Sequence, residues 1–552
     1  MKLFNFKKIY ILKNIVRDIF NKKQQKDFYK LENYKKKIKI DKKTVYKYFN
    51  YLFNSDSCID FKKNFRTKLN KKYIEAVLPI ASDKSNLFDY YLDKKKFNKK
   101  IYNGLNFLRI NVKNKKSFSF LLKNDEICQK PILVKNKNKK KLVILLMVDG
   151  LGYDLLKHMK KTQKFFGKSN IFKNAWNNSE WTLPTFGNLI TGKYTSNHLC
   201  FHPITYYDDK TRMFYHYKKN IFELFKSHEF ITGCYSPYMR INPTYNPMKG
   251  VDIFKFCENE TINEVLEHVT SQVNLFDNSS NFIFAHLFDG HGPMKKQFSV
   301  SEYSYFDKKN YFFNDYSSLK KGPEKFHRGH DDVRIVSLFN MMDDKLNVFL
   351  NNLIKFIKDK KFDDYSIVLF GDHGTRLESS TTKNNNIYDK SKNRIETMVS
   401  GKKETLNKSI NNIGLMIKDK KNKKNKINKL VETIDILPSL VERFNLDKKK
   451  EIKKILKDID GTNTIFSGKN KKHQISESIY MSKYYTVVRK NNMSLAMEYD
   501  LNHKTISKLR NYKFYNKNEN LVEINKINKL LKKEFLKIGT SHVQKNKLIK
   551  NP

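Results

Sequence analysis

Three mainly apolar runs stand out in the middle of the chain, at residues 142–148, 281–288 and 365–370. Apolar runs of this length are typical of strands that are buried on both faces of a parallel sheet. Residues 333–358 instead carry apolar side chains at helical spacing and lead into the third run. Strands and helices alternate in this way from residue 142 to about 445. The pattern therefore predicts an α/β fold with a mixed, mostly parallel sheet sandwiched by helices.

The remaining sequence divides into an N-terminal and a C-terminal part. Residues 1–138 are rich in Lys, Asn and aromatic residues and contain no motif, so we treat them as an N-terminal extension of unknown role. We predict the main domain at residues 139–445. Residues 446–552 include a strand pattern at 484–489 and end in a lysine-rich tail, which predicts a small C-terminal α+β subdomain. A chain of 552 residues has room for two or three such units.

Acidic and imidazole side chains follow each of the three apolar runs. Asp149 follows the first run, Asp289 and His291 follow the second, and Asp372 and His373 follow the third. Ligands of open α/β sheets bind beyond the carboxyl ends of the strands, where these side chains would meet. Carboxylate and imidazole ligands suit Zn or Mn, whereas all-oxygen sites suit Ca or Mg. The sequence therefore predicts one or two divalent metal ions at this edge, with Zn, Mn, Ca and Mg all left open.

Thr182 is the hydroxyl that we expect to face this site. It lies in the segment 181–185, Trp-Thr-Leu-Pro-Thr. A divalent ion neutralises the oxygens of a phosphate or sulfate ester and lowers the pKa of a bound hydroxyl, so Thr182 could attack the ester. Asp289 and His291 would then bind a second ion or the substrate, and His291 could instead protonate the leaving group. The plainer reading of Thr182 is a helix N-cap or a strand residue, and Asp-Gly pairs are common in turns.

The charge of the chain is strongly positive. It has 109 Lys and Arg against 56 Asp and Glu, a net charge of +53. Lysines occur throughout, without a concentrated Arg stripe or a nucleic-acid-binding module, so we expect no nucleic acid partner. The field of the protein should nevertheless favour anionic substrates. Five cysteines are scattered and lack metal-ligand spacing, which indicates reduced, buried thiols: Cys58, Cys128, Cys200, Cys234 and Cys257.

The N-terminal segment does not read as a targeting signal. Residues 1–20 are basic and amphipathic, but their apolar runs are short and no small-residue cleavage site follows. No stretch approaches the roughly 20 apolar residues of a transmembrane helix. We therefore expect a soluble, cytoplasmic protein and leave peripheral membrane contact open.

Taken in order, these motifs resemble those of the alkaline-phosphatase superfamily, and specifically its sulfatase-like branch. The resemblance extends from about residue 140 to 525 and implies a metal-dependent hydrolase or transferase of phosphoric or sulfuric esters. By this resemblance Thr182 and His291 are catalytic, and Asp149, Asp289, Asp372 and His373 bind metal. The matching segments are similar to the opening metal motif, the nucleophile motif, the motif of the ester-contacting histidine, the Asp-His-Gly metal motif and the closing Asp-x-x-Pro-Thr-Leu helix: 148–153, 181–194, 287–293, 370–374 and 434–440.

Three departures from the branch's pattern bear on the substrate. Gly150 stands where many sulfatases have a second metal-binding aspartate, and the Gly-Lys-x-His motif expected near 234–239 is absent. Thr182 stands where true sulfatases carry the Cys or Ser that becomes formylglycine. That maturation cannot start from threonine, whose β-carbon carries a methyl group. Threonine nucleophiles of this superfamily belong to phosphodiesterases, phosphomutases and phosphoryl-headgroup transferases, so the resemblance implies a phosphoester, on a glycan or a lipid headgroup.

Two alternatives remain open at this point. The first is a sulfate-ester hydrolase that acts without formylglycine. The second is an inactive, sulfatase-derived protein that binds anionic glycans or lipids, which the net charge of +53 and the missing aspartate at Gly150 would favour.

Overall fold

The computed structural model describes most of the chain after residue 63. The described residues are 51–53, 64–82, 84–122, 126–135, 137, 139–198, 200, 220–238, 241, 249–257, 260–290, 333–374, 406, 408–421, 428–467, 470–480, 483–502, 505–517 and 521–545.

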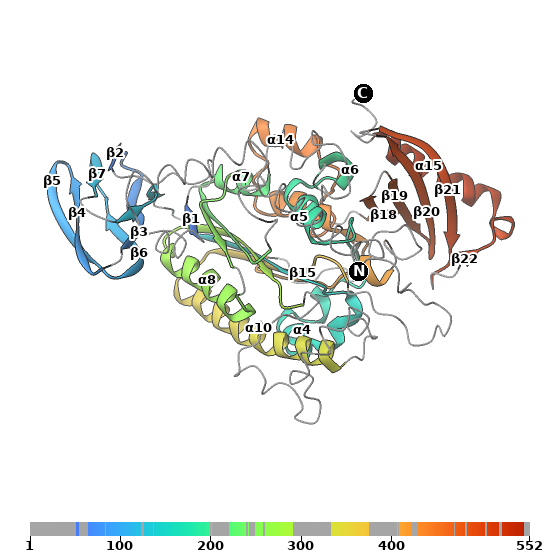
Figure 1. Cartoon of the computed structure of the whole chain (residues 1–552), viewed down its shortest axis with the longest axis horizontal. Coiled ribbons are helices and arrows are strands. Elements are labelled where there is room, and N and C mark those ends of the chain that lie inside the picture. The colour runs from blue at the N-terminus through green and yellow to red at the C-terminus, as the bar shows by residue number, and fades with distance from the viewer. Residues whose placement is uncertain are drawn as a thin grey trace, which may run out of the picture.

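A seven-stranded sheet forms the centre of the molecule (Figure 1), in the order β1-β13-β12-β14-β10-β15-β16. The four junctions from β13 to β15 are parallel, and only the outer strands β1 and β16 run antiparallel to their neighbours. This sheet confirms the predicted mixed, mostly parallel α/β architecture. Its strands are β1 (Tyr51–Phe53), β13 (Ile253–Phe256), β12 (Phe230–Ser236), β14 (Ser280–Leu287), β10 (Lys141–Val148), β15 (Asp364–Gly371) and β16 (Leu415–Asp419).

Helices cover both faces of this sheet, which explains the continuous apolar runs. Successive side chains of a strand point to opposite faces. In β10, Leu142, Ile144, Leu146 and Val148 join one core cluster, and Val143, Leu145 and Met147 join the other. The first core includes residues of η1 (Tyr153–His158), α4 (Lys160–Phe166), α8 (Ile262–Leu275) and α10 (Val333–Asp359). The second includes residues of α5 (Thr182–Thr191), α7 (Ile221–Lys226), α13 (Ile436–Arg443) and α14 (Lys450–Lys457).

Short elements connect these layers. A two-stranded parallel sheet pairs β11 with β17 beside the central sheet. The bounds of the short elements are η2 (Lys168–Asn170), β11 (Ala175–Trp176), α6 (Thr195–His198), α12 (Lys408–Asn411), β17 (Val431–Glu432) and η9 (Thr433–Asp435).

The N-terminal part consists of antiparallel strands around a core of its own. One sheet has the order β2-β7-β4-β5, and in the other β3 pairs with β6, β8 and β9. Val77, Ile132 and Val134 also join a core of the central sheet, which attaches this part to the main domain. The strands are β2 (Asn64–Lys68), β3 (Tyr73–Ser82), β4 (Asn86–Leu92), β5 (Lys95–Ile101), β6 (Gly104–Asn111), β7 (Ser117–Leu121), β8 (Ile127–Cys128) and β9 (Ile132–Lys135).

The C-terminal part is a five-stranded antiparallel sheet with one long helix (Figure 1). Phe535 and Val543 of that helix, α15 (Lys529–Lys545), share a core cluster with the sheet. Ile452 of α14, in contrast, packs in a core of the central sheet. The remaining elements are β18 (Gln474–Tyr480), β19 (Lys483–Lys490), β20 (Met493–Asn502), β21 (Thr505–Tyr515), β22 (Leu521–Val522) and η10 (Ile524–Lys526).

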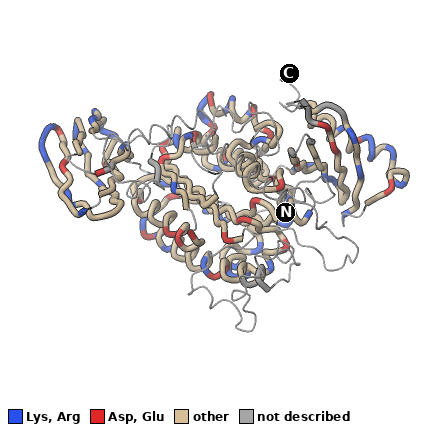
Figure 2. Tube along the Cα trace, viewed as in Figure 1, with Lys and Arg blue, Asp and Glu red and all other residues tan. Residues whose placement is uncertain are grey.

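Basic side chains are spread over all three parts rather than gathered in one stripe (Figure 2). Acidic residues are interspersed among them. None of the helices in the described part of the chain has the length and apolarity needed to cross a membrane. Four cysteines, Cys128, Cys200, Cys234 and Cys257, are buried free thiols, as predicted.

Candidate metal and nucleophile site

Asp149 and Asp372 lie side by side at the carboxyl edge of the central sheet. β10 and β15 are parallel neighbours, and their register pairs Val148 with Gly371, so each aspartate is the first residue after its strand. Both carboxylates are buried, with exposures of 1% and 0%. The backbone N–H of Gly150 donates to Asp372 Oδ1 at 2.9 Å and ties the two strand ends together. Gly150 has φ +71°, a conformation that costs other residues energy.

His373 completes a compact group with these two carboxylates. Its Nδ1 lies 2.9 Å from the carbonyl oxygen of Gly374, which can only accept, so Nδ1 carries the proton. Nε2 then presents its lone pair to Asp372 Oδ2 at 3.4 Å and Asp149 Oδ1 at 3.9 Å. One ligand atom from each of the three residues lies within 4.8 Å of the others. A hydrogen bond that fixes the second ring nitrogen is typical of metal-binding histidines.

The electrostatics of this group fit a divalent cation. Within the described part of the chain, the buried Asp372 Oδ2 accepts no hydrogen bond. Burial raises the pKa of Asp149 well above its usual value, and the neighbouring Asp372 carboxylate raises it further. Two buried carboxylates and an imidazole lone pair that face one another repel unless positive charge lies between them. Residues Asp149, Asp372 and His373 would hold such an ion, and their mixed oxygen and nitrogen donors suit Zn or Mn.

Thr182 lies against the same carboxylates. It is the first residue of α5, after the N-cap residue Trp181, and only 3% of its surface is exposed. Its Oγ1 donates to Asp149 Oδ2 at 3.3 Å. The predicted neighbourhood of hydroxyl and carboxylate is therefore present. As the start of a ten-residue helix, this position also lies in the positive potential of the helix N-terminus, which favours an anion.

Close packing of α5 fixes the position of this hydroxyl. A Cβ atom at Gly187 would lie 2.6 Å from His198 Cε1 and 2.8 Å from Cys200 Cβ. Only a glycine lets the helix approach these side chains so closely. Phe186 and Leu183 of the same helix are fully buried in the core of the sheet. The helix therefore presents Thr182 in one position.

His286 is a residue of this site that the sequence analysis did not single out. It precedes the last residue of β14 and pairs with Met147 in register. Its Nε2 lies 3.4 Å from Asp149 Oδ2, and its Nδ1 lies 3.3 Å from Ser236 Oγ. Burial lowers its pKa to about 4, so it is neutral at pH 7. The sequence signal for this residue is an imidazole inside the apolar run 281–288, a run that otherwise indicates only a core strand.

The second pair of predicted ligands is placed only in part. Asp289 lies in the turn after β14, with 4% of its surface exposed, outside the compact three-residue group. A Cβ atom at Gly290 would lie 2.0 Å from the carbonyl oxygen of Asp149, so this turn runs directly past the site. His291 lies outside the described residues.

A buried amide network supports the site from the side of the C-terminal sheet. Asn177 Nδ2 and Thr185 Oγ1 both donate to the carbonyl oxygen of Asp372, the latter at 3.0 Å. Ser476 of β18 in turn donates to the carbonyl oxygen of Asn177 at 2.8 Å. Asn178 Nδ2 donates to the carbonyl oxygen of Ile475 at 2.8 Å. The C-terminal part thus holds the segment that positions a candidate metal ligand.

The main domain is similar in sequence to a known protein family. A profile of the Sulfatase family matches residues 141–446. A crystal structure of Ps i-CgsB superposes with a TM-score of 0.52 and 13% identity, over 74% of this chain and 94% of that one. Its complex with k-i-k-neocarrahexaose gives 0.51 and 13% over the same shares. At this identity the likeness shows the fold alone.

The phosphonate monoester hydrolase SpPMH from Silicibacter pomeroyi superposes with a TM-score of 0.47 and 11% identity, over 73% of this chain and 95% of that one. No curated protein matches the chain in sequence.

Proposed function

The chain belongs to the sulfatase family, and we propose that it is a metal-dependent hydrolase or transferase of phosphoesters with Thr182 as its nucleophile. One observation carries this proposal. The Thr182 hydroxyl lies 3.3 Å from Asp149 Oδ2, and that aspartate belongs to a buried group with Asp372 and His373. A hydroxyl next to clustered metal-type ligands at the carboxyl edge of a parallel sheet is suited to metal-assisted ester cleavage.

The candidate site residues divide the chemical tasks among them. A divalent ion held by Asp149, Asp372 and His373 would neutralise the ester oxygens and lower the pKa of the Thr182 hydroxyl. The Thr182 hydroxyl releases its proton to solvent, Oγ1 forms a bond to phosphorus, and the bond from phosphorus to the alcohol oxygen breaks. The N-terminus of α5 stabilises the negative charge beside the attacking oxygen. The departing alkoxide must be protonated, and we assign His291 as the proton donor.

The phosphate ester formed on Thr182 must then be cleaved to regenerate the free hydroxyl. Water as the acceptor makes the protein a hydrolase, and a second alcohol makes it a transferase. Neutral His286 lies 3.4 Å from Asp149 Oδ2 and would orient that carboxylate without adding charge. Asp289, in the turn that passes Asp149, would bind a second ion or the substrate.

The residue at the nucleophile position favours phosphorus over sulfur. A formylglycine forms from a side chain whose β-carbon carries two hydrogens, and Thr182 has a methyl group there. Its hydroxyl can attack a phosphoester without maturation. The net charge of +53 suits a dianionic phosphate ester, whether the substrate is a glycan or a lipid headgroup.

The test compares three ester classes in the same metal-loaded protein. We expect turnover of a phosphate monoester or phosphodiester that exceeds turnover of an aryl sulfate. Thr182→Ala should lower kcat by about 10³-fold or more while the bound metal stays largely unchanged. Thr182→Ser, which keeps the hydroxyl, is the matched control and should retain activity. Unchanged activity of Thr182→Ala would refute the assignment of Thr182 as the nucleophile.

A second candidate function has one observation in its favour. Gly150 stands where many sulfatases have a metal-binding aspartate, so the ligand set is smaller than in those proteins. Such a protein could bind anionic glycans or lipids without catalysis. Metal analysis separates the two functions, because a protein that takes up no divalent ion and cleaves none of the esters would be a binding protein.

A further inference from the structure

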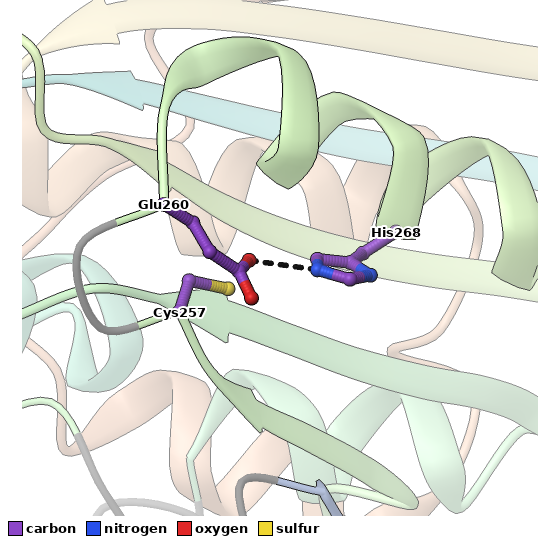
Figure 3. A group of neighbouring side chains, drawn as sticks. All are labelled: Cys257, Glu260 and His268. Carbon is purple, nitrogen blue, oxygen red and sulfur yellow. Dashed lines mark hydrogen bonds and ion pairs between the residues drawn. The ribbon is translucent and has the colours of Figure 1, made fainter. Parts of the chain in front are cut away.

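A second group of ligand-type side chains lies at the same edge of the central sheet (Figure 3). Cys257 directly follows β13, Glu260 precedes α8, and His268 projects from α8. One ligand atom from each of the three lies within 4.8 Å of the others. Strand β13 is separated from β10 by β12 and β14. At about 4.8 Å per strand, the group lies roughly 14 Å from Asp149 along the sheet.

We propose that Cys257, Glu260 and His268 form a binding site for a thiophilic divalent cation such as Zn²⁺, separate from the site at Asp149. A thiolate, a carboxylate and an imidazole are the three side-chain donors that zinc prefers. Donors at zinc distances of about 2.0–2.3 Å lie at most about 4.6 Å apart, so the three residues need only small side-chain movements. The fourth position is left for water, as in zinc sites with three protein ligands.

The surroundings of the group are suited to a bound ion. Cys257 is fully buried, whereas the side chains of Glu260 and His268 are each 19% exposed and give access from solvent. The ring of Tyr235 stacks on the His268 imidazole, with centroids 5.9 Å apart and planes 13° from parallel. Tyr235 is fixed in turn, because its hydroxyl donates to Gln272 Oε1 at 2.7 Å. This packing orients the imidazole before any ion arrives.

A simpler reading of the same residues is an ion-pair network. Lys255 Nζ lies 2.9 Å from Glu260 Oε1, and His268 Nε2 lies 2.7 Å from Glu260 Oε2. Such a network would join the end of β13 to α8 without any ion. In that network the Cys257 thiol only donates a weak hydrogen bond, 3.5 Å long, to the Lys255 carbonyl oxygen, and burial and Glu260 raise its pKa. A divalent ion would convert that thiol to a thiolate and use Oε2, while Lys255 keeps Oε1.

Cobalt(II) is the probe that distinguishes the two readings. A cobalt–thiolate bond produces an intense near-ultraviolet charge-transfer band, which oxygen and nitrogen ligands do not produce. The site at Asp149 contains no cysteine, so the band would report the Cys257 site alone. Full-length protein would be stripped with a chelator and titrated with Co²⁺, and then with Zn²⁺ as competitor.

We expect the band in the parent protein and in Cys128→Ser, whose thiol is buried in the N-terminal strands. Cys257→Ser should lose it. Asp372→Asn, which weakens the other site, should keep it. Glu260→Gln and His268→Gln should each weaken zinc binding by more than the roughly 10–100-fold typical of a residue that only supports a ligand. These two variants decide the matter if Cys257→Ser does not fold, as judged by circular dichroism.

Lys255→Gln should change metal affinity in the opposite direction from the ligand variants. Removing a positive charge next to a ligand carboxylate should tighten Co²⁺ binding by several-fold, because the ammonium repels the ion. Absence of the band in the parent, or its persistence in Cys257→Ser, would overturn the proposal. Unchanged or weaker binding in Lys255→Gln would show that Glu260 is not a ligand and would also overturn it.

Discussion

The surroundings of Asp149 disfavour the ionised form of its carboxyl group. It is 1% exposed, and both burial and the adjacent Asp372 raise its pKa. A carboxyl group whose pKa is raised in the folded state binds protons more tightly there than in the unfolded chain. Its contribution to stability is therefore lost as the pH rises above about 4 through the folded-state pKa. Catalytic sites often carry such strain, and a bound cation relieves it.

The first prediction follows from this strain. Asp149→Asn should raise the Tm of metal-free protein, by about 1–2 °C for each kcal/mol of relieved repulsion, while uptake of divalent ions falls. The pH-dependent loss of stability above about pH 4 should shrink in the variant. Differential scanning fluorimetry with chelator, at several pH values, measures both effects.

Asp343→Asn is the matched control for this experiment. This buried carboxylate accepts from the backbone N–H groups of Lys161 and Thr162 at the start of α4, at 2.8 and 2.6 Å. Its charge is stabilised rather than strained, so the variant should have a lower Tm. An equal shift in both variants would contradict the account of Asp149.

His198 gives a second prediction, for acid stability. Its Nδ1 accepts from the Cys200 N–H at 2.9 Å, its Nε2 lies 2.7 Å from Asn188 Oδ1, and burial lowers its pKa to about 3. The unfolded chain takes up a proton here below about pH 6.5, and the folded protein does not. Stability is therefore lost as the pH falls from 6.5 towards 3, by up to about 3 kcal/mol at pH 4.

Urea unfolding at pH 7 and pH 4 tests this prediction. His198→Gln can still donate to Asn188 and has no group that titrates in this range. The free energy of unfolding of the variant should fall less between the two pH values than that of the parent. Equal losses in parent and variant would exclude His198 as the source.

At the scale of elements, the opposite edge of the sheet depends on one buried cation. Arg443, at the end of α13, donates to both oxygens of Asp364 in β15 and to the carboxylate of Asp419 in β16. The three side chains are at most 6% exposed. Because Asp364 begins β15 and Asp372 follows its end, this cluster lies at the edge away from Thr182.

Arg443→Leu should lower the free energy of unfolding by about 3–5 kcal/mol, because it removes the guanidinium that pairs with two buried carboxylates, while the exposed Lys421 still contacts Asp364. Arg443→Lys keeps the charge but loses the bidentate hydrogen bonds, so its loss of unfolding free energy should be smaller. Chemical denaturation measures both values. Residual folded Arg443→Leu protein should retain the parent kcat, and a selective loss of kcat would contradict the separation of the two edges.

At the scale of the whole molecule, Glu477 joins the C-terminal sheet to the main domain. This buried carboxylate accepts from Ser196 N at 2.8 Å and Ser196 Oγ at 2.6 Å in α6. It also contacts His542 Nε2 of α15 at 2.5 Å and the hydroxyl of Tyr484. One side chain thus holds an element of the main domain, a strand and the last helix.

Glu477→Gln should destabilise this junction by about 3–5 kcal/mol, since His542 loses its anionic partner. Calorimetry should then show the C-terminal sheet unfolding at a lower temperature than the rest. Glu523→Gln is the control, because the pair of Glu523 with Lys526 is solvent-exposed and should change stability by less than about 0.5 kcal/mol. A single unchanged transition in Glu477→Gln would refute the role of this junction.

The net charge of +53 gives a prediction for substrate encounter. Attraction of an anionic ester over distances of about 10 Å is screened at an ionic strength of 0.1 M. We therefore expect kcat/KM for a phosphoester to fall by up to about tenfold between low and physiological salt. The value of kcat, which excludes the encounter step, should change little. A salt-independent kcat/KM would show that the charge does not steer the substrate.

The central sheet was predictable because its signal is local. The run 142–148 is apolar at every position, and only a strand covered on both faces buries all of these side chains. The N-terminal strands are less predictable, and the pairs of lysines in β5 are one reason. In β5, Lys-Lys-Phe-Asn-Lys-Lys-Ile, six of the seven residues remain at least partly exposed. Strands with little buried surface show only a weak apolar pattern in the sequence.

The sequence by itself determined the order of the motifs and the placement of Asp149 and Asp372 directly after two separate apolar runs, because strand periodicity and chain direction depend on neighbouring residues. Only the tertiary structure decided which side chains meet. The contacts of His286 and Asn177 depend on strand register and on packing between residues distant in sequence, and the group at Cys257 depends on how α8 folds back beside β13. Such contacts arise when the core closes, and no local pattern encodes them.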